Sequence, residues 1–536
     1  MRFERATEVT AGSTLHTGIC IVGSGAAGIA LARQLDGSGK QVLLLEAGGL
    51  ERDRPVEDEA FAVQHLGVPY SNPCSTRGRW FGGSTNLWFG RIAMFEPIDF
   101  EPRPWVPHSG WPLSFDELRP WVQTAARILA VPQFERIRAE AWARHPALDL
   151  FVERGGASFG VFVWADGLYM GPYNQSALEG SRNVKVLLDA TATALIPNES
   201  STAIDSLSVL GAGGNRFQVK AASYVLAAGG LENPRLLLAS TARCEQGIGN
   251  DHDLVGRFYM DHPRTQSIAT VDLERATAHQ FEQLKMLGEH SSPQHGKVQL
   301  RVTFQPALQR EQSLLNHSMH ADFASPIHGS PGYQAAMRLK SRLSGKNVDA
   351  IGEPLASDVQ SDVRATLKGV PALLEYGLQK LRKRARPAHM YLHDQMEQEP
   401  DPQSRVTVDP GRRDKWGLPG LQLDWRIGES TYRSQTRMHQ LFKQILERSG
   451  IHGFRSPLLD HPGEKPLLME MKHPSGTTRM SASPSNGVVD PDLRVHGVDN
   501  LYVAGSSVFP TVGHANPTLL IVALAARLAE HLRARE

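Results

Sequence analysis

Residues 18–28 read Gly-Ile-Cys-Ile-Val-Gly-Ser-Gly-Ala-Ala-Gly, an apolar run that ends in the pattern G-x-G-x-x-G. An alanine-rich segment over 26–35 follows, and then a second apolar run over 41–45. Near-continuous apolar runs on either side of an alanine-rich segment are typical of two buried parallel strands joined by a helix. The stretch therefore predicts the first strand–helix–strand unit of a parallel sheet covered on both faces.

The glycines of this unit indicate a dinucleotide site. Gly23 permits the tight turn, Gly25 lets a pyrophosphate approach the backbone, and Gly28 lets helix and strand pack closely. A lone G-x-G-x-x-G can be merely a close helix–strand contact, but here Glu46 also ends the next strand, where a carboxylate can bind ribose hydroxyls. That carboxylate would repel a 2′-phosphate, which disfavours NADP. We expect the cofactor to lie against Gly23, Ser24, Gly25, Ala26, Ala27, Gly28, Glu46 and Ala47.

Composition sets the remaining limits. The 536 residues exceed one hydrophobic core, so two or three domains, or one large composite unit, are expected. The net charge of +1 favours neither nucleic acid nor an acidic membrane as a partner. Cys20, Cys74 and Cys244 are far apart and odd in number, which argues against a disulfide framework or a metal site. Residues 1–17 lack the apolar core of a signal peptide, and the longest apolar stretch, 518–528, is too short for a membrane span, so a cytoplasmic protein is predicted.

The rest of the chain predicts two architectures. We expect a strand pair over 185–188 and 203–209, further strand over 216–219 and 224–227, a buried strand over 501–504 and a final helix over 518–532. Alternating patterns over 298–304, 391–398 and 405–408 indicate an antiparallel sheet instead. The predicted fold class is therefore an α/β Rossmann-like domain with a parallel sheet, plus an α+β domain with an antiparallel sheet.

Residues 325–387 interrupt the second part. The segment is polar, partly helical and rich in Gly, Ser and Lys/Arg, and the sequence leaves open whether it is a substrate-side lid or a solvated helical insertion. It ends in the basic run Lys380–Arg386. A run of this kind can dock on a membrane or a partner, but one short run on a neutral chain favours a solvated helix face.

Several blocks, in order and spacing, together resemble the glucose–methanol–choline (GMC) oxidoreductases. They are residues 22–48, Trp80–Asn86 (WFGGSTN), Leu226–Pro234 (LAAGGLENP), Val255–Pro263 (VGRFYMDHP), and a C-terminal pair, His473–Met480 (HPSGTTRM) and Gly513–Thr518 (GHANPT). The resemblance implies an FAD-dependent oxidoreductase that acts on CH–OH donors. It also implies a discontinuous FAD-binding domain (1–107, 186–264 and 466–536) and a substrate-binding domain (108–185 and 265–465).

The resemblance implies further cofactor contacts. They are Gly82, Gly83, Ser84 and Asn86 at the isoalloxazine, Ala192 near adenine, Ala228 and Gly229 near the dinucleotide, and Gly505 and Ser506 near the pyrophosphate and ribityl chain. Many relatives carry an Asp close to Gly505; this chain does not, which leaves that contact open. Some members attach FAD through a histidine at the position of Leu87. An aliphatic side chain cannot form that bond, so the FAD is expected to be dissociable.

The C-terminal pair carries the chemistry that the resemblance implies. Alcohol oxidation by hydride transfer needs a base for the hydroxyl proton, which suits His473, and a neutral group that orients the oxygen, which suits Asn516. Pro517 and Thr518 are expected to begin the last helix, with its N-terminal dipole directed at the flavin. From residue type alone, His473 could be a surface histidine and Asn516 a helix cap; His514 fits the pocket lining or packing beneath the loop equally well.

Residues 500–519 look closest to the sugar-oxidising branch, including pyranose oxidases and glycoside 3-dehydrogenases. We therefore expect oxidation of a secondary ring hydroxyl of a pyranose or glycoside, with oxygen or another acceptor reoxidising the flavin. Because side chains alternate between the two faces of a strand, His393, Gln395 and Glu397 are expected to share one face, which is a candidate substrate-binding face. The alternatives are a GMC-type enzyme acting on a non-sugar alcohol or a specialised metabolite, by desaturation, cyclisation or lyase chemistry, and a flavin-binding protein without catalysis.

Overall fold

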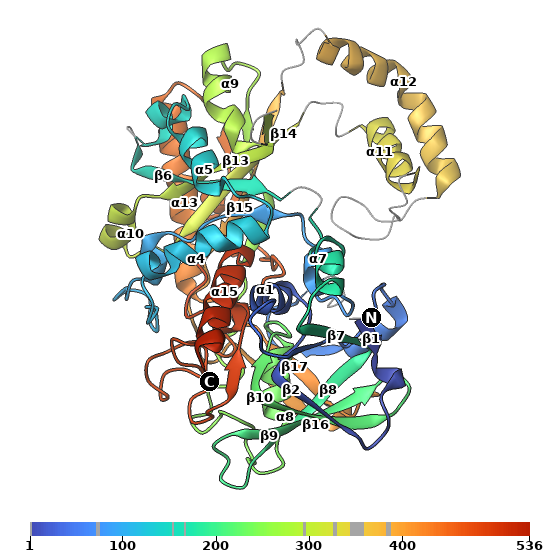
Figure 1. The fold of residues 1–536 in the computed structure, drawn as a ribbon. Coiled ribbons are helices and arrows are strands. Elements are labelled where there is room, and N and C mark those ends of the chain that lie inside the picture. Colours follow the sequence, from blue (N-terminus) through green and yellow to red (C-terminus); the bar gives the residue numbers. More distant parts are fainter. Residues whose placement is uncertain are drawn as a thin grey trace.

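The computed structural model describes residues 3–70, 76–152, 155–165, 168–292, 296–324, 330–343, 358–381 and 387–535. Cys74, the 344–357 stretch and Arg382–Arg386 of the basic run lie outside the described residues. Two large sheets, one in each half of the molecule, organise the fold (Figure 1).

The first sheet is built on the apolar runs of the N-terminus. Its order is β1-β7-β3-β2-β10-β9-β8, with β19 beside β10. The strands are β1 (Phe3–Arg5), β2 (Thr14–Val22), β3 (Val42–Leu45), β7 (Val184–Leu188), β8 (Ala190–Pro197), β9 (Ile204–Gly211), β10 (Arg216–Leu226) and β19 (Leu501–Val503). The pairs β2–β3, β3–β7, β2–β10 and β10–β19 are parallel. Helix α1 (Ala26–Leu35) packs against the C-terminal helix α15 (Thr518–Ala534), and α7 (Met170–Glu179) packs against α1.

Two details of this sheet differ from the sequence prediction. The 185–188 strand does not pair with 203–209: β7 joins β3, whereas β9 pairs with β8 and β10. Residues 216–226 form one long strand rather than two. The changed pairing arises because β8, the strand after β7 that carries Ala192, forms the hairpin with β9.

The second sheet is antiparallel throughout, in the order β18-β11-β15-β14-β13-β6-β5, with β12 beside β13. The strands are β5 (Arg91–Ile92), β6 (Ala157–Trp164), β11 (Arg264–Asp272), β12 (His290–Ser292), β13 (Gly296–Phe304), β14 (His317–Ala324), β15 (His389–Met396) and β18 (Phe454–Arg455). Its helices include α4 (Phe115–Ile128), α5 (Phe134–Trp142), α9 (Ala278–Leu284), α10 (Pro306–Gln312) and α13 (Glu429–Arg448). The predicted two-part architecture is confirmed.

A third, smaller sheet lies in the same half of the molecule as the first sheet (Figure 1) and packs on the helix over residues 232–239, although two of its strands come from the predicted substrate-binding segment 265–465. It consists of β4 (Val63–His65), β17 (Pro419–Asp424) and β16 (Arg405–Arg413). The predicted strand 405–408 therefore belongs here, hydrogen-bonded to β17, and not to the large antiparallel sheet. The shorter helices are α2 (Arg54–Ala60), α3 (Pro97–Phe100), α8 (Glu232–Ala239) and α14 (Pro457–Asp460).

Two helices stand away from the body of the molecule (Figure 1). They are α11 (Pro331–Leu343) and α12 (Val359–Leu381), which pack on each other and lie in the chain between the adjacent strands β14 and β15. Within the described ranges, no helix combines the length and the apolar character that a membrane crossing requires.

Candidate active site

The nucleotide-binding part of the site forms where parallel strands end together. The Gly23 N–H donates to the Leu45 carbonyl at 2.8 Å, Ala227 donates to Val22 at 2.8 Å, and Ala504 donates to Leu226 at 2.7 Å. These bonds place the ends of β2, β3, β10 and β19 at one edge of the first sheet. Ligands of such α/β sheets bind at the carboxyl ends of the strands.

The glycines at this edge fall into two kinds. A Cβ on Gly28 would lie 1.9 Å from the Gly23 carbonyl oxygen, and one on Gly23, whose φ is +102°, would lie 2.7 Å from the Ala227 oxygen. Those two positions serve close packing. A Cβ on Gly25 or Gly229 would meet nothing within 4 Å. The open space beside Gly25 and Gly229 fits the close approach of a pyrophosphate to the backbone.

Glu46 lies at the same edge. Its buried carboxylate accepts hydrogen bonds from Ser24 Oγ at 2.5 Å, from the Ser24 N–H at 3.2 Å and from the Gly48 N–H at 2.9 Å. Burial raises the pKa of Glu46, against the lowering effect of these donors. The Ala190 N–H donates to the Glu46 carbonyl at 2.8 Å, so β8, which carries Ala192, begins beside Glu46 and Ala47.

The double-glycine loop lies directly on the first turn. The Gly82 N–H donates to the Ser24 carbonyl at 3.1 Å, and a short 3-10 helix, Gly83–Asn86, follows and contains Ser84. Asn86 donates through Nδ2 to the Phe81 carbonyl at 2.9 Å, while its buried Oδ1 has no hydrogen-bond partner within the described chain. An acceptor left free here is suited to a ligand donor.

Asn233 connects the remaining cofactor segments, a role that the sequence reasoning missed. Its Oδ1 accepts from the Ala228 N–H at 2.8 Å, and its Nδ2 donates to the Ala504 carbonyl at 3.2 Å and to Ser507 Oγ at 3.0 Å. One buried amide thus holds Ala228–Gly229 against Gly505–Ser506. The sequence feature that could have indicated this role is the polar Asn233 at the start of the apolar helix α8.

His473 is brought to this edge by two sets of backbone bonds. The Gly476 N–H donates to the Ser506 carbonyl at 3.1 Å, and Ser475 and Met260 exchange backbone bonds of 2.8 and 3.0 Å. The His473 N–H donates to Asp261 Oδ2 at 2.9 Å. The catalytic block predicted from the sequence therefore lies between the Gly505–Ser506 turn and the Val255–Pro263 block.

A second imidazole, His262, fixes the proton on His473. His262 Nε2 lies 3.2 Å from the Val512 carbonyl, which can only accept, so this nitrogen carries the hydrogen. Burial lowers the pKa of His262 to about 3, which leaves its Nδ1 bare. That Nδ1 lies 3.0 Å from His473 Nδ1 and must accept from it. The proton of His473 therefore resides on Nδ1, and its Nε2 keeps a free lone pair.

Asp261, His262 and His473 also bring ligand-type atoms within 4.8 Å of one another. The Asp261 carboxylate accepts from the N–H groups of His262 at 2.7 Å, Met471 at 3.0 Å and His473 at 2.9 Å. The two imidazoles are paired with each other. We therefore interpret this cluster as a hydrogen-bond chain rather than a metal centre.

Asn516 is held by hydrogen bonds to strands of the second sheet. Gln395 Nε2 donates to Asn516 Oδ1 at 3.0 Å and to the His514 carbonyl at 2.7 Å. Asn516 Nδ2 donates to the Arg91 carbonyl at 3.3 Å. Arg301 Nη1 in turn donates to Gln395 Oε1, so β13 and β15 hold the Asn516 loop from above.

The other two substrate candidates have different surroundings. The His514 ring lies against Phe162, with ring centroids 6.1 Å apart, and its Nε2 is 3.6 Å from Glu96 Oε1. His393 stacks on His320 at 5.2 Å, and its Nε2 is 3.1 Å from Asp322 Oδ2. Pro517 precedes the first residue of α15, Thr518, instead of forming its first turn.

Arg301 is the most notable residue that the sequence reasoning passed over. It is fully buried, lies 3.7 Å from the centre of the Phe162 ring, and pairs with no carboxylate among the described residues. Its Nε and Nη2 have no hydrogen-bond partner there either. Burial lowers its pKa well below the usual value. The signal was present in the sequence, since Gln299, Arg301 and Thr303 alternate with apolar residues along one strand.

Register places these side chains on one face of the sheet. Thr303 pairs with Ser318, Ser318 with Gln395, and His320 with His393. Residues two apart on a strand point to the same side. The resulting polar face, all of it buried or nearly so, consists of Arg301, Thr303, Ser318, His320, His393 and Gln395.

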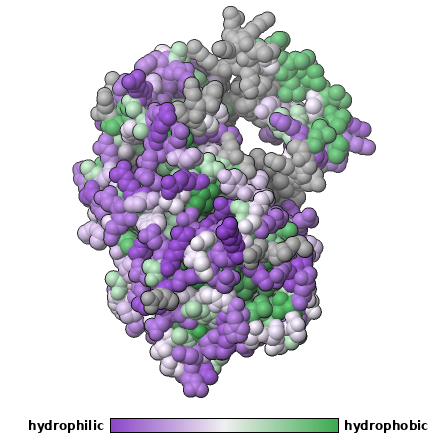
Figure 2. Space-filling view, viewed as in Figure 1, coloured by the Kyte–Doolittle hydropathy of each residue, from purple (hydrophilic) through white to green (hydrophobic). Residues whose placement is uncertain are grey.

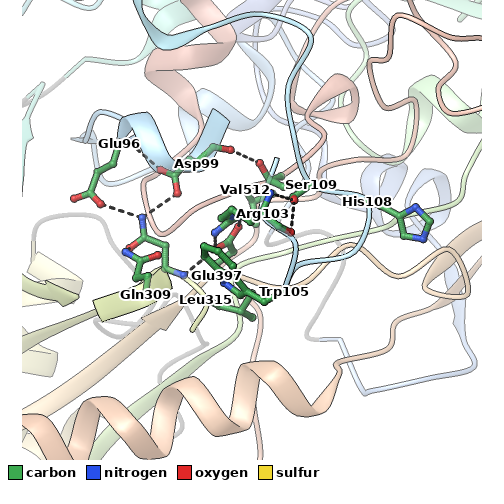
Figure 3. A network of polar contacts seen from close by, with 12 residues as sticks. Glu96, Asp99, Arg103, Trp105, His108, Ser109, Gln309, Leu315, Glu397 and Val512 are labelled. Atoms are coloured by element: carbon green, nitrogen blue, oxygen red, sulfur yellow. Dashed lines mark hydrogen bonds and ion pairs between the residues drawn. The ribbon is translucent and has the colours of Figure 1, made fainter. Parts of the chain in front are cut away.

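Glu397 extends the predicted face but forms a separate network (Figure 3). Its fully buried carboxylate pairs with Arg103, at 2.8 Å for Nη1, and accepts the Asn316 N–H at 2.8 Å. Burial, then Glu397 and Glu96, raise the pKa of the adjacent Asp99 to about 7. The Asp99 carbonyl accepts from Thr511 Oγ1 at 2.7 Å. This network supports the loop that leads to Asn516, so we interpret Glu397 as structural.

Comparison with known proteins agrees with this geometry. Residues 18–248 match a family model described as FAD dependent oxidoreductase, and residues 400–525 match one described as GMC oxidoreductase. The protein is an FAD-dependent oxidoreductase of the class that acts on alcohol groups. Within that class, the chain contains a GMC oxidoreductase domain over residues 400–525.

Individual relatives cover the chain to different extents. The fructose dehydrogenase large subunit of Gluconobacter japonicus is 23% identical over 96% of this chain and 98% of that protein. A C-glycoside 3-oxidase of Microbacterium trichothecenolyticum is 34% identical over 24% of each chain. A crystal structure of formate oxidase covers 98% of this chain and 99% of that chain, with a TM-score of 0.56 and 18% identity. The predicted family, fold, enzyme class and FAD cofactor are confirmed, whereas the roles of single residues stay predictions.

Proposed function

We propose that this enzyme oxidises a secondary hydroxyl of a pyranose, free or in a glycoside, to a ketone. The observation that carries the proposal is the polar face of the second sheet, in which Arg301, Thr303 and His320 keep buried polar atoms without protein partners among the described residues. Leaving such atoms unpaired costs roughly 1–3 kcal/mol each. Because these atoms are closed off from solvent, side chains must move to open this face. A substrate with several hydroxyl groups can then pair the atoms, whereas a simple alkyl alcohol cannot.

Two of the relatives support the same substrate class. The full-length relative is named for fructose, and the partial relative for C-glycosides. Both names describe sugars or their glycosides, in agreement with the polar face. We propose a secondary ring position as the site of oxidation because residues 500–519 resemble the sugar-oxidising branch.

In the proposed reaction, His473 Nε2 takes the hydroxyl proton, because its lone pair is free and the Nδ1 proton is held by His262. Asn516 orients the carbinol oxygen, since its second Nδ2 hydrogen remains available for donation. Bound FAD supplies the hydride acceptor. In the proposed site, the positive dipole end of α15, which begins at Thr518, faces the bound cofactor.

We also propose that the residues of the cofactor edge bind FAD without a covalent bond. Leu87 follows the Gly83–Asn86 turn directly and has an aliphatic side chain. Denaturing the protein with acid should therefore release the flavin into the supernatant.

Anaerobic flavin bleaching tests the substrate. A methyl 6-deoxyhexopyranoside has a blocked anomeric carbon and no primary hydroxyl, so any hydride that it supplies comes from a secondary ring carbon. We expect such a glycoside to bleach the flavin absorbance of the purified holoenzyme. A glycoside in which each ring hydroxyl is replaced in turn by hydrogen would identify the position.

Two outcomes would contradict the proposal. Bleaching by short-chain alcohols or diols but by no glycoside would place the enzyme among those acting on non-sugar alcohols. Substrate turnover without any reduced flavin would indicate redox-neutral chemistry on another metabolite.

The pH profile of kcat/KM is a further prediction. Burial, then His262, Arg264 and Arg301, hold the pKa of His473 well below its usual 6.5. A base is active only when deprotonated, so activity should persist through pH 6.5 and fall only at lower pH. Steady-state rates with a dye acceptor, with FAD content checked at each pH, would measure it. Half-maximal activity at pH 7 or above would show that His473 is not held neutral as described.

A further inference from the structure

Helices α11 and α12 pack on each other through small and polar groups. A Cβ on Gly332 would lie 2.6 Å from the Gly369 Cα, so the two backbones touch at this point. Asp362 is fully buried between the helices and pairs with Arg338 at 2.7 Å and with Arg342. The contact between the helices therefore contains a glycine pair and an ion-pair cluster.

The outer face of α12 is apolar instead. Six aliphatic side chains, defined here as the aliphatic stripe, are exposed: Val359 (53%), Val363 (40%), Leu367 (65%), Val370 (37%), Leu374 (64%) and Leu378 (53%). At the helical period these residues span an arc of only about 100°. Figure 2 shows hydrophobic side chains gathered over this projecting hairpin.

This arrangement is the reverse of a helical hairpin that is surrounded by water. In water, an amphipathic helix turns its apolar stripe toward its neighbour and its polar side outward. Small residues at the helix contact with aliphatic residues outside are instead characteristic of helices in lipid. The aliphatic stripe therefore requires an apolar environment beyond the hairpin itself.

The charges beside the stripe identify that environment. Arg364 and Lys368 are exposed on α12 between the stripe and α11, together with one acidic residue, Glu375, and Lys340 is exposed on α11. In the sequence, five more basic residues follow between positions 380 and 386. An aliphatic stripe with a basic flank is the pattern of a helix that lies in the plane of an anionic membrane surface.

A protein partner fits these residues less well. The cores of protein interfaces are rich in Tyr, Trp and Phe, and the stripe contains only Val and Leu. We propose that α12 docks on the surface of an anionic lipid bilayer, with the aliphatic stripe at the boundary of the acyl chains. Because α12 is not apolar enough to cross a membrane, it lies on the surface, with the substrate-binding sheet held nearby by β14 and β15.

Vesicle flotation of the full-length holoenzyme tests this proposal. Phosphatidylcholine vesicles containing phosphatidylglycerol should carry the protein upward, and vesicles of phosphatidylcholine alone should carry much less. The double variant Leu367→Gln/Leu374→Gln should lower the bound fraction at least about tenfold. Its rate with a water-soluble substrate should not change, because the stripe is exposed on a hairpin that stands away from the body of the molecule (Figure 1).

Matched variants distinguish lipid docking from self-association. Leu66→Gln/Leu467→Gln changes two exposed leucines (54% and 76%) outside the hairpin and should leave flotation unchanged. Arg364→Glu/Lys368→Glu should abolish the preference for anionic vesicles. Failure of the wild-type protein to bind either vesicle would overturn the proposal. So would a dimer, detected by light scattering, that the Leu367→Gln/Leu374→Gln variant dissociates, since the stripe would then cover a second copy of the chain.

Discussion

The His473→Ala variant is expected to lose kcat by about 10²- to 10⁴-fold while retaining its fold and its FAD. The reason is the hydrogen-bond chain from the Val512 carbonyl through His262 to His473, which leaves one imidazole nitrogen free to take the hydroxyl proton. Without that base the proton must pass to solvent. Residual activity should therefore rise with pH, and added imidazole should restore part of it. Steady-state kinetics across pH would measure both effects.

The control is His452→Ala, which removes an exposed histidine outside the site and should leave kcat unchanged. Flavin spectra of both variants would show that cofactor content is equal. If His473→Ala kept its activity within a few-fold of the wild type at equal FAD content, the assignment of His473 as the base would be wrong. The Asn516→Ala variant should also lower kcat, without the rescue by imidazole.

The second large effect is expected on stability. Arg103 and Glu397 form an ion pair in which both side chains are fully buried. Replacing Arg103 with methionine leaves the Glu397 carboxylate without its counterion beside Asp99, and breaking a buried pair in this way costs about 3–5 kcal/mol. The midpoint of urea unfolding, followed by tryptophan fluorescence, should fall accordingly.

A matched exposed pair provides the control. Arg136 and Glu140 are exposed at adjacent turns of α5, so Arg136→Met should change the free energy of unfolding by no more than about 0.5 kcal/mol. The double variant Arg103→Met/Glu397→Leu should recover part of the lost stability, because it removes both charges. A loss of under about 1 kcal/mol in Arg103→Met would mean that the pair contributes no more than a surface pair does.

Local sequence was sufficient for the parts of the fold that local rules determine. The Gly23–Gly28 turn, the strands on either side of α1, and the helix after Pro517 follow from apolar runs and glycine positions. The grouping of the cofactor residues at one edge follows from the parallel strand order. Strand β8 was expected only through the family resemblance, which puts Ala192 on a strand after Leu188, because its small alanine and threonine side chains give a weak local signal.

Contacts between distant segments could not be obtained in this way. His262 and His473 are 211 positions apart, and nothing in either block specifies that the two Nδ1 atoms meet. The alternation of side chains along the strand correctly placed His393, Gln395 and Glu397 on one face. It could not show that Glu397 pairs with Arg103 and so belongs to a separate network. The same limit applies to Arg301, whose polar strand face gains meaning only when the neighbouring strands are aligned.

The three-stranded sheet has a mechanical consequence for how the substrate enters. Val63, Gln64 and His65 pair with Leu421, Leu423 and the residue between them, so backbone hydrogen bonds hold the 405–424 segment on the half that contains the first sheet. The chain enters this segment from β15 and leaves it into α13, which lie in the other half, so swinging the halves apart would strain both short connections or pull the segment away from β4. We therefore expect the His473 and Asn516 loops to keep their spacing through the catalytic cycle, with the substrate admitted by local movement of side chains or surface loops.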